Sequence, residues 1–385
     1  MRPCFGFCLC WFASAWAQQP GTLISLPKVS ASGVFDPSVA DTPPGERAWM
    51  SFSAVDPSPR WPDKDTRTIT TRLAYSDDRG ATWTDAGYRL NDISEAGSGS
   101  KAATWVNEVS SLVYDRYAPP EERWKLFWHH YLRVNEDGEF QNGWIGYKSA
   151  ASPQALRSAT ELKLFGARAY DAVNDDPQSQ THPPVGGPPL IRVHALHKDL
   201  AMCVALTEPG AMATPSGLYL SLDCFEPKVQ NAVGLLAMGI LGVKGRVMML
   251  KCDAPCHPAN PGAWRYIATM LTDDDAKAAG FLRYSASDLF AQDGNAYLMV
   301  SPVSDKPVKA SYNGCHIYRF SNLEKAMLEL DRDKPRIIRK VQGHPGSFNG
   351  ACTFQTSVAP SGFLYGEIDF AGRPVFRIFQ TGRER

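Results

Sequence analysis

A recurring pair of short segments rich in aliphatic and aromatic residues limits the possible folds more than any other feature. The first segment of each pair begins near an acidic or small residue, and the second follows after a turn. The pairs are Asp36–Ala40 with Arg47–Phe52, Glu108–Val113 with Arg123–Trp128, Asp199–Val204 with Gly217–Leu222, Asp288–Ala291 with Asn295–Val300, and Gly350–Phe354 with Gly362–Glu367. Such segments between Gly, Pro, Asn and Asp clusters are typical of β-strands. The sequence therefore predicts an all-β chain with an internal repeat.

Further strands follow each pair, so the repeat contains more than a hairpin. These strands are Thr68–Ser76, Gly143–Ser149, Arg246–Cys252, Gly314–Phe320 and Pro374–Thr381. A closed β-propeller of about five blades, each with four antiparallel strands, fits the chain length. The last unit has only three strands before the chain ends. Thr22–Val29 is predicted to supply its missing outer strand, because closing the ring removes exposed sheet edges.

The N-terminus has the features of a signal peptide. Arg2 is followed by the apolar run Phe5–Trp16, and Ala15-Trp16-Ala17 matches a cleavage site. The run is too short to span a membrane, which takes about 20 residues. Residues 18–385 are expected to form a single propeller domain that is periplasmic or secreted, with no membrane association after the signal is removed.

Six of the nine cysteines lie outside this leader, an even number that favours disulfides in an exported chain. Six cysteines allow 15 pairings. We predict Cys203–Cys224, because both flank a hairpin, Cys252–Cys256, because three residues separate them, and Cys315–Cys352, which joins the fourth and fifth units. A zinc site at Cys252, Cys256 and His257 is disfavoured, because no second ligand pair has zinc spacing.

The charge balance excludes several classes of function. Lys and Arg number 40, as do Asp and Glu. A neutral chain has no electrostatic attraction for nucleic acid or an anionic membrane. The sequence also lacks the G-x-S-x-G, H-E-x-x-H and phosphate-loop motifs, which disfavours serine-hydrolase, zinc-protease and nucleotide chemistry. No cofactor is expected.

Ser76-Asp77-Asp78-Arg79-Gly80-Ala81-Thr82-Trp83 matches the S-x-D-x-G-x-T-W pattern of the Asp-box. Ser and Asp side chains can bond the backbone of the turn, and Gly80 can adopt a positive φ. The motif resembles the Asp-boxes of sialidase-like propellers, where it joins a blade's third and fourth strands away from the active site. The F/Y-R-I-P arginine motif of sialidases is missing, which argues against sialidase activity.

Phe35-Asp36-Pro37-Ser38-Val39 resembles the opening of the five-bladed propellers of glycoside hydrolase family 43. In that family the Asp is the general base, and the next two innermost strands hold a pKa-tuning carboxylate and a general acid. The resemblance assigns these two places to Glu108 and Asp199, with Glu208 as an alternative acid. Here Glu and Asp are exchanged relative to the family pattern.

The innermost strands of a propeller converge on its channel, so Asp36, Glu108, Asp199 and Asp288 are predicted to form a ring of carboxylates. Glycoside hydrolysis needs one ionised and one protonated carboxyl, a division that crowding of like charges promotes. We predict an exported glycosidase with Asp36 as base or nucleophile and Glu108 as acid. The predicted substrate-binding residues are Asp288, Arg283, His344, Asn349 and Glu208. The alternative is a non-catalytic propeller that binds glycan or protein at the same mouth of the central channel.

Overall fold

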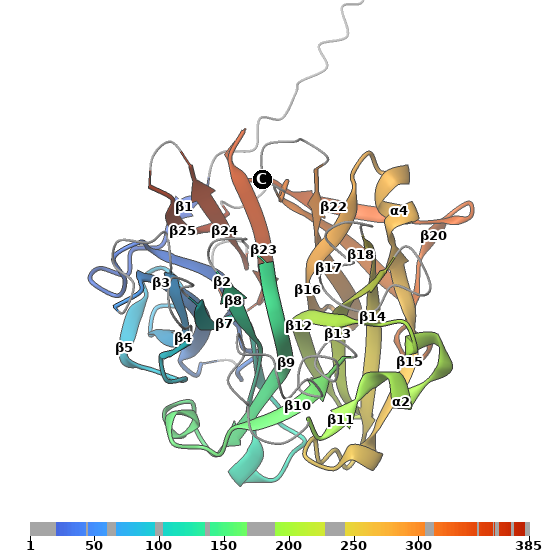
Figure 1. The fold of residues 1–385 in the computed structure, drawn as a ribbon, viewed down its shortest axis with the longest axis horizontal. Coiled ribbons are helices and arrows are strands. Elements are labelled where there is room, and N and C mark those ends of the chain that lie inside the picture. Colours follow the sequence, from blue (N-terminus) through green and yellow to red (C-terminus); the bar gives the residue numbers. More distant parts are fainter. Residues whose placement is uncertain are drawn as a thin grey trace, which may run out of the picture.

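The structure, a computed structural model, shows five antiparallel four-stranded blades arranged in a ring (Figure 1). It describes residues 21–381 except 44, 60–66, 97–102, 135–138, 168–188, 228–242, 305–311, 345, 357, 359–361 and 371–372. The predicted signal peptide lies outside these residues. The five-bladed β-propeller predicted from the sequence is confirmed.

The inner three strands of each blade follow one another along the chain from the centre of the ring outward, and the outer strand of blade V comes from the N-terminal segment. Blade I contains β2 (Val34–Val39), β3 (Ala48–Pro57), β4 (Arg67–Ser76) and β5 (Thr84–Arg89); blade II contains β7 (Ala103–Tyr114), β8 (Trp124–Val134), β9 (Glu139–Ala150) and β10 (Leu162–Gly166). Blade III contains β12 (Ala205–Thr214), β13 (Gly217–Pro227), β14 (Val243–Asp253) and β15 (Trp264–Thr272); blade IV contains β16 (Arg283–Gln292), β17 (Asn295–Val303), β18 (Cys315–Asn322) and β22 (Ile337–Val341). Blade V contains β23 (Phe348–Phe354), β24 (Phe363–Asp369), β25 (Val375–Gln380) and β1 (Thr22–Leu23).

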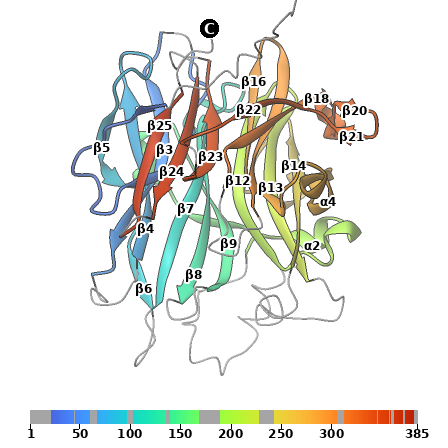
Figure 2. The ribbon, with the colours of Figure 1, turned by 90° about the horizontal axis from the view of Figure 1, so that it is seen from above.

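Short strands and helices lie outside the four strands of each blade. The additional strands are β6 (Ser94–Ala96), β11 (Ile191–Arg192), β19 (Met327–Leu328), β20 (Leu330–Asp331) and β21 (Lys334–Pro335), and the helices are α2 (Val193–Leu196) and α4 (Asp273–Ala278). In the second view the strands of neighbouring blades are seen along their length (Figure 2). No helix among the described residues is long and apolar enough to cross a membrane.

The N-terminal segment closes the ring, as the sequence predicts. Thr22 and Leu23 pair antiparallel with Gln380 and Phe379, and the Ile24 N–H donates to the Ile378 carbonyl at 2.9 Å. The first strand of the chain therefore completes the last blade.

Apolar side chains fill the space between neighbouring blades. Each of the five blade interfaces contains a buried cluster, and the cluster between blades I and II is representative. There Trp49 and Leu73 of blade I pack with Leu112, Trp124 and Leu126 of blade II. Similar clusters lie between blades II and III, III and IV, IV and V, and V and I. Burial of these faces joins the blades, since each blade alone would expose them.

A β-bulge recurs at the same place in all five innermost strands. In each strand the pairing with the second strand skips two residues. The first skipped residue has a φ between 46° and 56°; these residues are Asp36, Val109, Glu208, Ala286 and Ala351. Positive φ is unfavourable for L-residues other than glycine by roughly 1–2 kcal/mol, so the surrounding structure must hold these five positions.

Hydrogen bonds between blades hold the bulges. In two interfaces the N–H of the bulge residue donates to a serine on the second strand of the preceding blade. The Val109 N–H donates to Ser53 Oγ at 3.3 Å, and the Ala351 N–H donates to Ser301 Oγ at 2.8 Å. In a third interface the Ala286 N–H donates to the Glu208 carboxylate of the preceding blade. In these three interfaces the contact therefore joins the bulge of one innermost strand to the preceding blade.

Two residues after the first bulge residue, a second set of hydrogen bonds links the blades. Ser38 Oγ accepts from the Leu112 N–H at 3.0 Å, and Ser111 Oγ accepts from the Ala211 N–H at 2.9 Å. Thr353 Oγ1 of blade V accepts from a backbone N–H of blade I at 3.3 Å. Hydroxyl residues at this position therefore connect one blade to the next.

Blade III has Gly210 at this position instead of a side chain. A Cβ there would lie 2.4 Å from the Ser287 carbonyl oxygen and 2.6 Å from the Asp288 Cα. The backbones of blades III and IV thus approach too closely for any other residue.

The Ser76–Trp83 turn joins β4 to β5 and forms the local hydrogen bonds expected from its sequence. Asp78 accepts from the Thr82 N–H at 2.8 Å, and Ser76 Oγ accepts from the Gly80 N–H at 2.7 Å. Gly80 has a φ of 83°, and Trp83 is buried. Antiparallel pairing places this turn at the opposite end of blade I from Asp36. The relation to sialidases remains an expectation from the motif.

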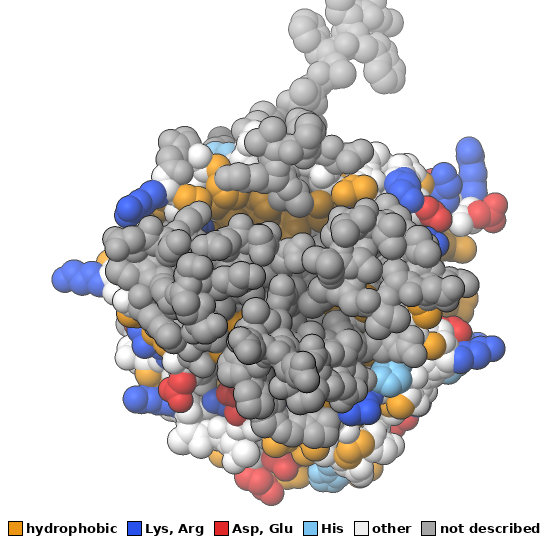
Figure 3. Space-filling model, viewed as in Figure 1, with side chains coloured by type: hydrophobic (Ala, Val, Ile, Leu, Met, Phe, Trp, Pro, Cys, Tyr) orange, Lys and Arg blue, Asp and Glu red, His pale blue; other side chains and the backbone are white. Residues whose placement is uncertain are grey.

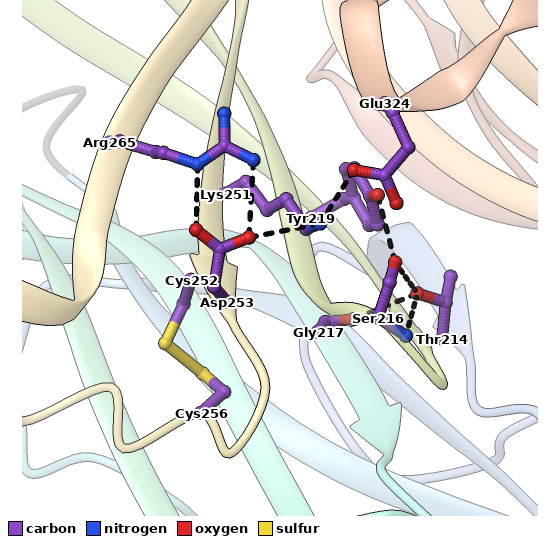
Figure 4. Close-up of polar contacts among 10 residues, drawn as sticks. All are labelled: Thr214, Ser216, Gly217, Tyr219, Lys251, Cys252, Asp253, Cys256, Arg265 and Glu324. Atoms are coloured by element: carbon purple, nitrogen blue, oxygen red, sulfur yellow. Dashed lines mark hydrogen bonds and ion pairs between the residues drawn. A yellow bond between two sulfur atoms is a disulfide. The ribbon is translucent and has the colours of Figure 1, made fainter.

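The predicted disulfides Cys203–Cys224, Cys252–Cys256 and Cys315–Cys352 are all present. Beside Cys252, Asp253 accepts from Arg265 Nε at 2.7 Å and pairs with Lys251 Nζ at 3.0 Å (Figure 4). Lys251 Nζ also reaches Glu324 of blade IV at 2.6 Å. A disulfide and an ion network therefore secure this end of blade III.

The serine hydroxyls between blades predict a measurable contribution to stability. In the Ser38→Ala and Ser111→Ala variants a buried N–H loses its acceptor, which costs about 1–3 kcal/mol. Urea unfolding should give this loss for both variants, whereas Ser158→Ala, at an exposed position, should change little. Equal stability of the three variants would show that water replaces the lost acceptors.

Ring closure predicts that removal of residues 18–29 destabilises the whole domain. The deletion exposes the edge of β25 and removes the buried Ile24 and Val29 side chains, each contributing about 1.5–3 kcal/mol. Thermal unfolding of the truncated protein should show a lower midpoint in one transition. An unchanged midpoint would contradict closure by this segment.

Candidate active site

Three carboxylates from consecutive blades lie at one end of the channel, beside the bulges. Asp36 and Glu208 are the bulge residues of blades I and III, and Glu108 directly precedes the bulge of blade II. The negative charges of Glu108 and Glu208 both raise the pKa of Asp36, and the charge of Glu208 also raises that of Glu108. The three groups therefore interact electrostatically.

Asp36 is the most deeply buried of the three, with 5% of its surface exposed. Its carboxylate accepts from Ser53 Oγ at 2.9 Å. Burial raises its pKa well above the usual value, and the charge of Glu108 raises it further, whereas the Ser53 hydrogen bond lowers it. Pro37 follows in the bulge, where a residue outside the strand ladder needs no N–H.

Glu108 combines burial with a single strong donor. Tyr131 Oη donates to Glu108 Oε1 at 2.8 Å, and the Tyr131 ring stacks on His129, with centroids 4.5 Å apart. Burial raises the pKa of Glu108 to about 7, opposed by the Tyr131 hydrogen bond. Burial also lowers the pKa of His129 to about 3, so this imidazole is neutral.

Glu208 has the largest number of donors among the three. Oε1 accepts from Tyr312 Oη at 2.8 Å, and Oε2 accepts from Ser285 Oγ at 2.7 Å and from the Ala286 N–H. Asp223, on the neighbouring strand β13, lies 2.7 Å from the same Ser285 hydroxyl. Blade IV thus holds the Glu208 carboxylate in place through two consecutive residues.

The channel beyond the bulges is narrow and partly polar. A cavity of about 20 Å³ is lined by residues of all five innermost strands, among them Asp36, Ser110, Pro209 and Asp288. Asp288 lies two residues after Ala286, the first residue of its bulge, and so deeper along the channel than the three mouth carboxylates; burial raises its pKa to about 7. The structure thus places Asp288 in the channel but not among the carboxylates at the mouth.

The position predicted for Asp199 was wrong. Residues 198–200 form a 3₁₀ turn, stabilised by the Asp199 N–H donating to His197 Nδ1 at 3.2 Å, and the innermost strand of blade III starts only at Ala205. The Asp199 side chain is half exposed. Glu208 occupies the place at the mouth that the sequence analysis gave to Asp199.

The other predicted binding residues have structural partners. Arg283 lies over the Phe225 ring at 5.7 Å, and His344 Nδ1 lies 2.8 Å from Glu367. Asn349 is buried and accepts from the Gly343 N–H at 2.9 Å. His344 and Asn349 thus direct polar atoms to groups of the protein, whereas Arg283 Nε is buried with no hydrogen-bond partner among the described residues.

The sequence analysis named Glu208 only as an alternative acid and a binding residue, although its place in the repeat had a visible signal, and it missed Asp223. Phe35-Asp36-Pro37 and Thr207-Glu208-Pro209 share an acid–proline pair at the bulge of blades I and III. Aligning the repeats on this pair identifies Glu208 as the counterpart of Asp36. Asp223 had no comparable signal, because its role depends on the register between β12 and β13.

No family model matches the chain, and no curated protein matches it. Solved structures do. A thermostable family-43 glycoside hydrolase aligns over 90% of this chain and 88% of its own at 11% identity, with a TM-score of 0.46. An arabinanase of Bacillus subtilis aligns over 91% of this chain and 94% of its own, at 14% identity and a TM-score of 0.44. An α-L-arabinofuranosidase of Podospora anserina aligns over 94% of this chain and 95% of its own, at 11% identity and a TM-score of 0.48. The likeness is one of fold.

The surface agrees with the neutral composition. Basic and acidic side chains are interspersed around the rim of the face in Figure 3, as far as that face is described. Within the described part of the chain, no group of three or more His, Cys, Asp and Glu residues is arranged to hold a metal ion.

The raised pKa of Glu108 predicts how stability depends on pH. Folded Glu108 keeps its proton to about pH 7, whereas the unfolded chain releases it near pH 4.3. Between these pH values only the unfolded chain gains free energy by releasing the proton, so the stability of the fold falls as the pH rises. Wild-type stability should fall over this window by up to about 3 kcal/mol from this group. Glu108→Gln should remove that decrease in denaturant unfolding measured from pH 4 to 8.

The exposed Glu121 provides the control for this measurement. Glu121→Gln should leave the pH dependence of the wild type unchanged. If Glu108→Gln instead lowers stability at every pH, the Tyr131 hydrogen bond to the carboxylate outweighs the cost of burying it.

Proposed function

We propose that the chain is an exported glycoside hydrolase that cleaves its substrate at the mouth formed by Asp36, Glu108 and Glu208. The observation that supports the proposal is the electrostatic coupling of three carboxylates from consecutive blades at one end of the channel. The resemblance of Phe35–Val39 to the opening of the family 43 propellers agrees with it. A carbohydrate is the proposed ligand.

Coupling of the carboxylates provides the two protonation states that the reaction needs. Hydrolysis requires one ionised carboxylate, as base or nucleophile, and one protonated carboxyl to donate to the leaving oxygen. Like charges held together in a buried site cannot all ionise near neutral pH. The cluster therefore retains protons at pH values where isolated carboxyls have lost them.

We assign Asp36 as base or nucleophile and Glu208 as proton donor. They occupy the same bulge position in blades I and III, so the chain presents both from equivalent points of the repeat. Glu208 is also joined through Ser285 to another buried acid, Asp223. Glu108 lies in the blade between them, where its charge raises the pKa of Asp36.

One observation favours the alternative, a propeller that binds glycan or protein without catalysis. Asp36 is almost fully buried and hydrogen-bonded to Ser53, as expected of a structural carboxylate. In that case Asp36→Asn would leave ligand binding intact, and no bond would be cleaved.

The leaving group of the substrate separates the roles of the three acids. A good leaving group departs without protonation, so loss of the proton donor matters only for poor leaving groups. With aryl glycosides of graded phenol acidity, Glu208→Gln should reduce kcat by about 10²-fold or more for weakly acidic phenols and much less for strongly acidic ones. Asp36→Asn should reduce it for all of them.

Glu108→Gln completes the series. As a tuning group, its loss should shift the pH profile of kcat/KM while sparing the dependence on the leaving group. If Glu108→Gln rather than Glu208→Gln shows that dependence, Glu108 is the donor, as the sequence analysis first assigned it. If none of the three variants affects an identified hydrolysis, the mouth is not the active site.

A further inference from the structure

Two buried acids share one serine hydroxyl beneath the mouth. Ser285 Oγ lies 2.7 Å from Glu208 Oε2 and 2.7 Å from Asp223 Oδ2. Asp223 lies on β13, Glu208 on β12 and Ser285 on β16, so the three residues span the interface between blades III and IV. Asp223 is only 2% exposed.

The serine has one hydrogen and two acceptors at hydrogen-bond distance. It can donate to only one carboxylate, because a hydroxyl carries a single proton. The other 2.7 Å contact is a hydrogen bond only if that carboxyl carries a proton and donates to Ser285 Oγ. The geometry therefore requires one proton on the Asp223–Glu208 pair.

The surroundings decide which acid carries it. Glu208 accepts hydrogen bonds from Tyr312 Oη and from the Ala286 N–H, so both of its oxygens have donors within the protein. Asp223 Oδ1 is buried and has no hydrogen-bond partner among the described residues. Burial raises the pKa of Asp223 well above its usual value, and the charge of Glu208 raises it further. Asp223 is thus the neutral acid of the pair.

We infer that Asp223 is a positioning residue that holds a proton in reserve for Glu208 and delivers it through the Ser285 hydroxyl. In the resting state Asp223 donates to Ser285, and Ser285 donates to Glu208 Oε2. On transfer, the Asp223 O–H bond breaks as a new O–H forms on Ser285, and the original Ser285 hydrogen moves to Glu208. One proton moves, and the negative charge passes from Glu208 to Asp223.

Other charged and titratable groups face this chain from the neighbouring strands. Asp36 of blade I and Glu108 of blade II both interact with the charge of Glu208, and Tyr312 donates to it. When Asp36 or Glu108 is ionised, its negative charge favours movement of a proton toward Glu208, because the transfer withdraws a negative charge from the mouth.

Infrared spectroscopy tests the location of the proton without any substrate. The wild-type-minus-Asp223→Asn difference spectrum at pH 7 should contain the C=O stretching band of a protonated carboxyl, shifted in D₂O. Asp274, which is fully exposed and has a lowered pKa, gives the matched control: Asp274→Asn should remove only carboxylate bands. If Asp223→Asn also removes only carboxylate bands, Asp223 is ionised and the inference is wrong.

The hydroxyl is tested in the same spectra. Ser285→Ala should shift the Asp223 band to the frequency of a weakly bonded acid, whereas Ser285→Thr keeps the hydroxyl and should preserve it. Ser287→Ala, the neighbouring buried serine that bonds Ser221, should leave the band unchanged. An unshifted band in Ser285→Ala would show that Asp223 does not donate to Ser285.

Delivery of the proton rests on the proposed role of Glu208 and is tested by kinetics. Asp223→Asn should lower kcat by about tenfold for poor leaving groups, at unchanged KM, and spare good ones. Equal losses for both leaving groups would contradict delivery to Glu208. If Glu208→Gln itself shows no dependence on the leaving group, the proposed donor is wrong, whereas the infrared result still decides where the proton lies.

Discussion

The hydrogen bonds from the preceding blade to the bulge residues of blades II, IV and V are the constraint on which the rest of the structure depends. Val109 is bonded to Ser53, and Ala351 to Ser301, by the same contact in different interfaces. This contact holds residues at positive φ that would otherwise relax. A distorted innermost strand results in every blade, with the first residue of each distortion beside the channel.

The site follows from this repeat. Blades IV and V place alanine at the bulge, whereas blades I and III place Asp36 and Glu208 there. The fold thus supplies five equivalent positions, and the sequence uses two of them for acids. The hydrogen bonds between blades also link the candidate site to the stability of the fold. The Ser53 hydroxyl accepts from the Val109 N–H of the next blade and donates to the Asp36 carboxylate.

The sequence predicted the architecture well because its signals are local. Alternation of short aromatic strands, the missing outer strand of the last unit and the spacing of cysteines led to five blades, closure by Thr22–Val29 and the three disulfides. In the structure Thr22 and Leu23 of that segment form the closing strand. The site was predicted only in part. Asp199 precedes an apolar run that resembles a strand, but the His197 side chain closes a turn there. Asp223 and Ser285 meet only through register and blade packing, which the sequence does not display.

Cleavage of a glycan by the mouth carboxylates is the central claim, and proton NMR of oligosaccharides incubated with the purified mature protein tests it most directly. Wild-type protein should produce new anomeric signals from at least one glycan, and a protein carrying both Asp36→Asn and Glu208→Gln should bind that glycan without producing them. Binding by both proteins with no new anomeric signal from either would contradict hydrolysis and leave a glycan-binding propeller.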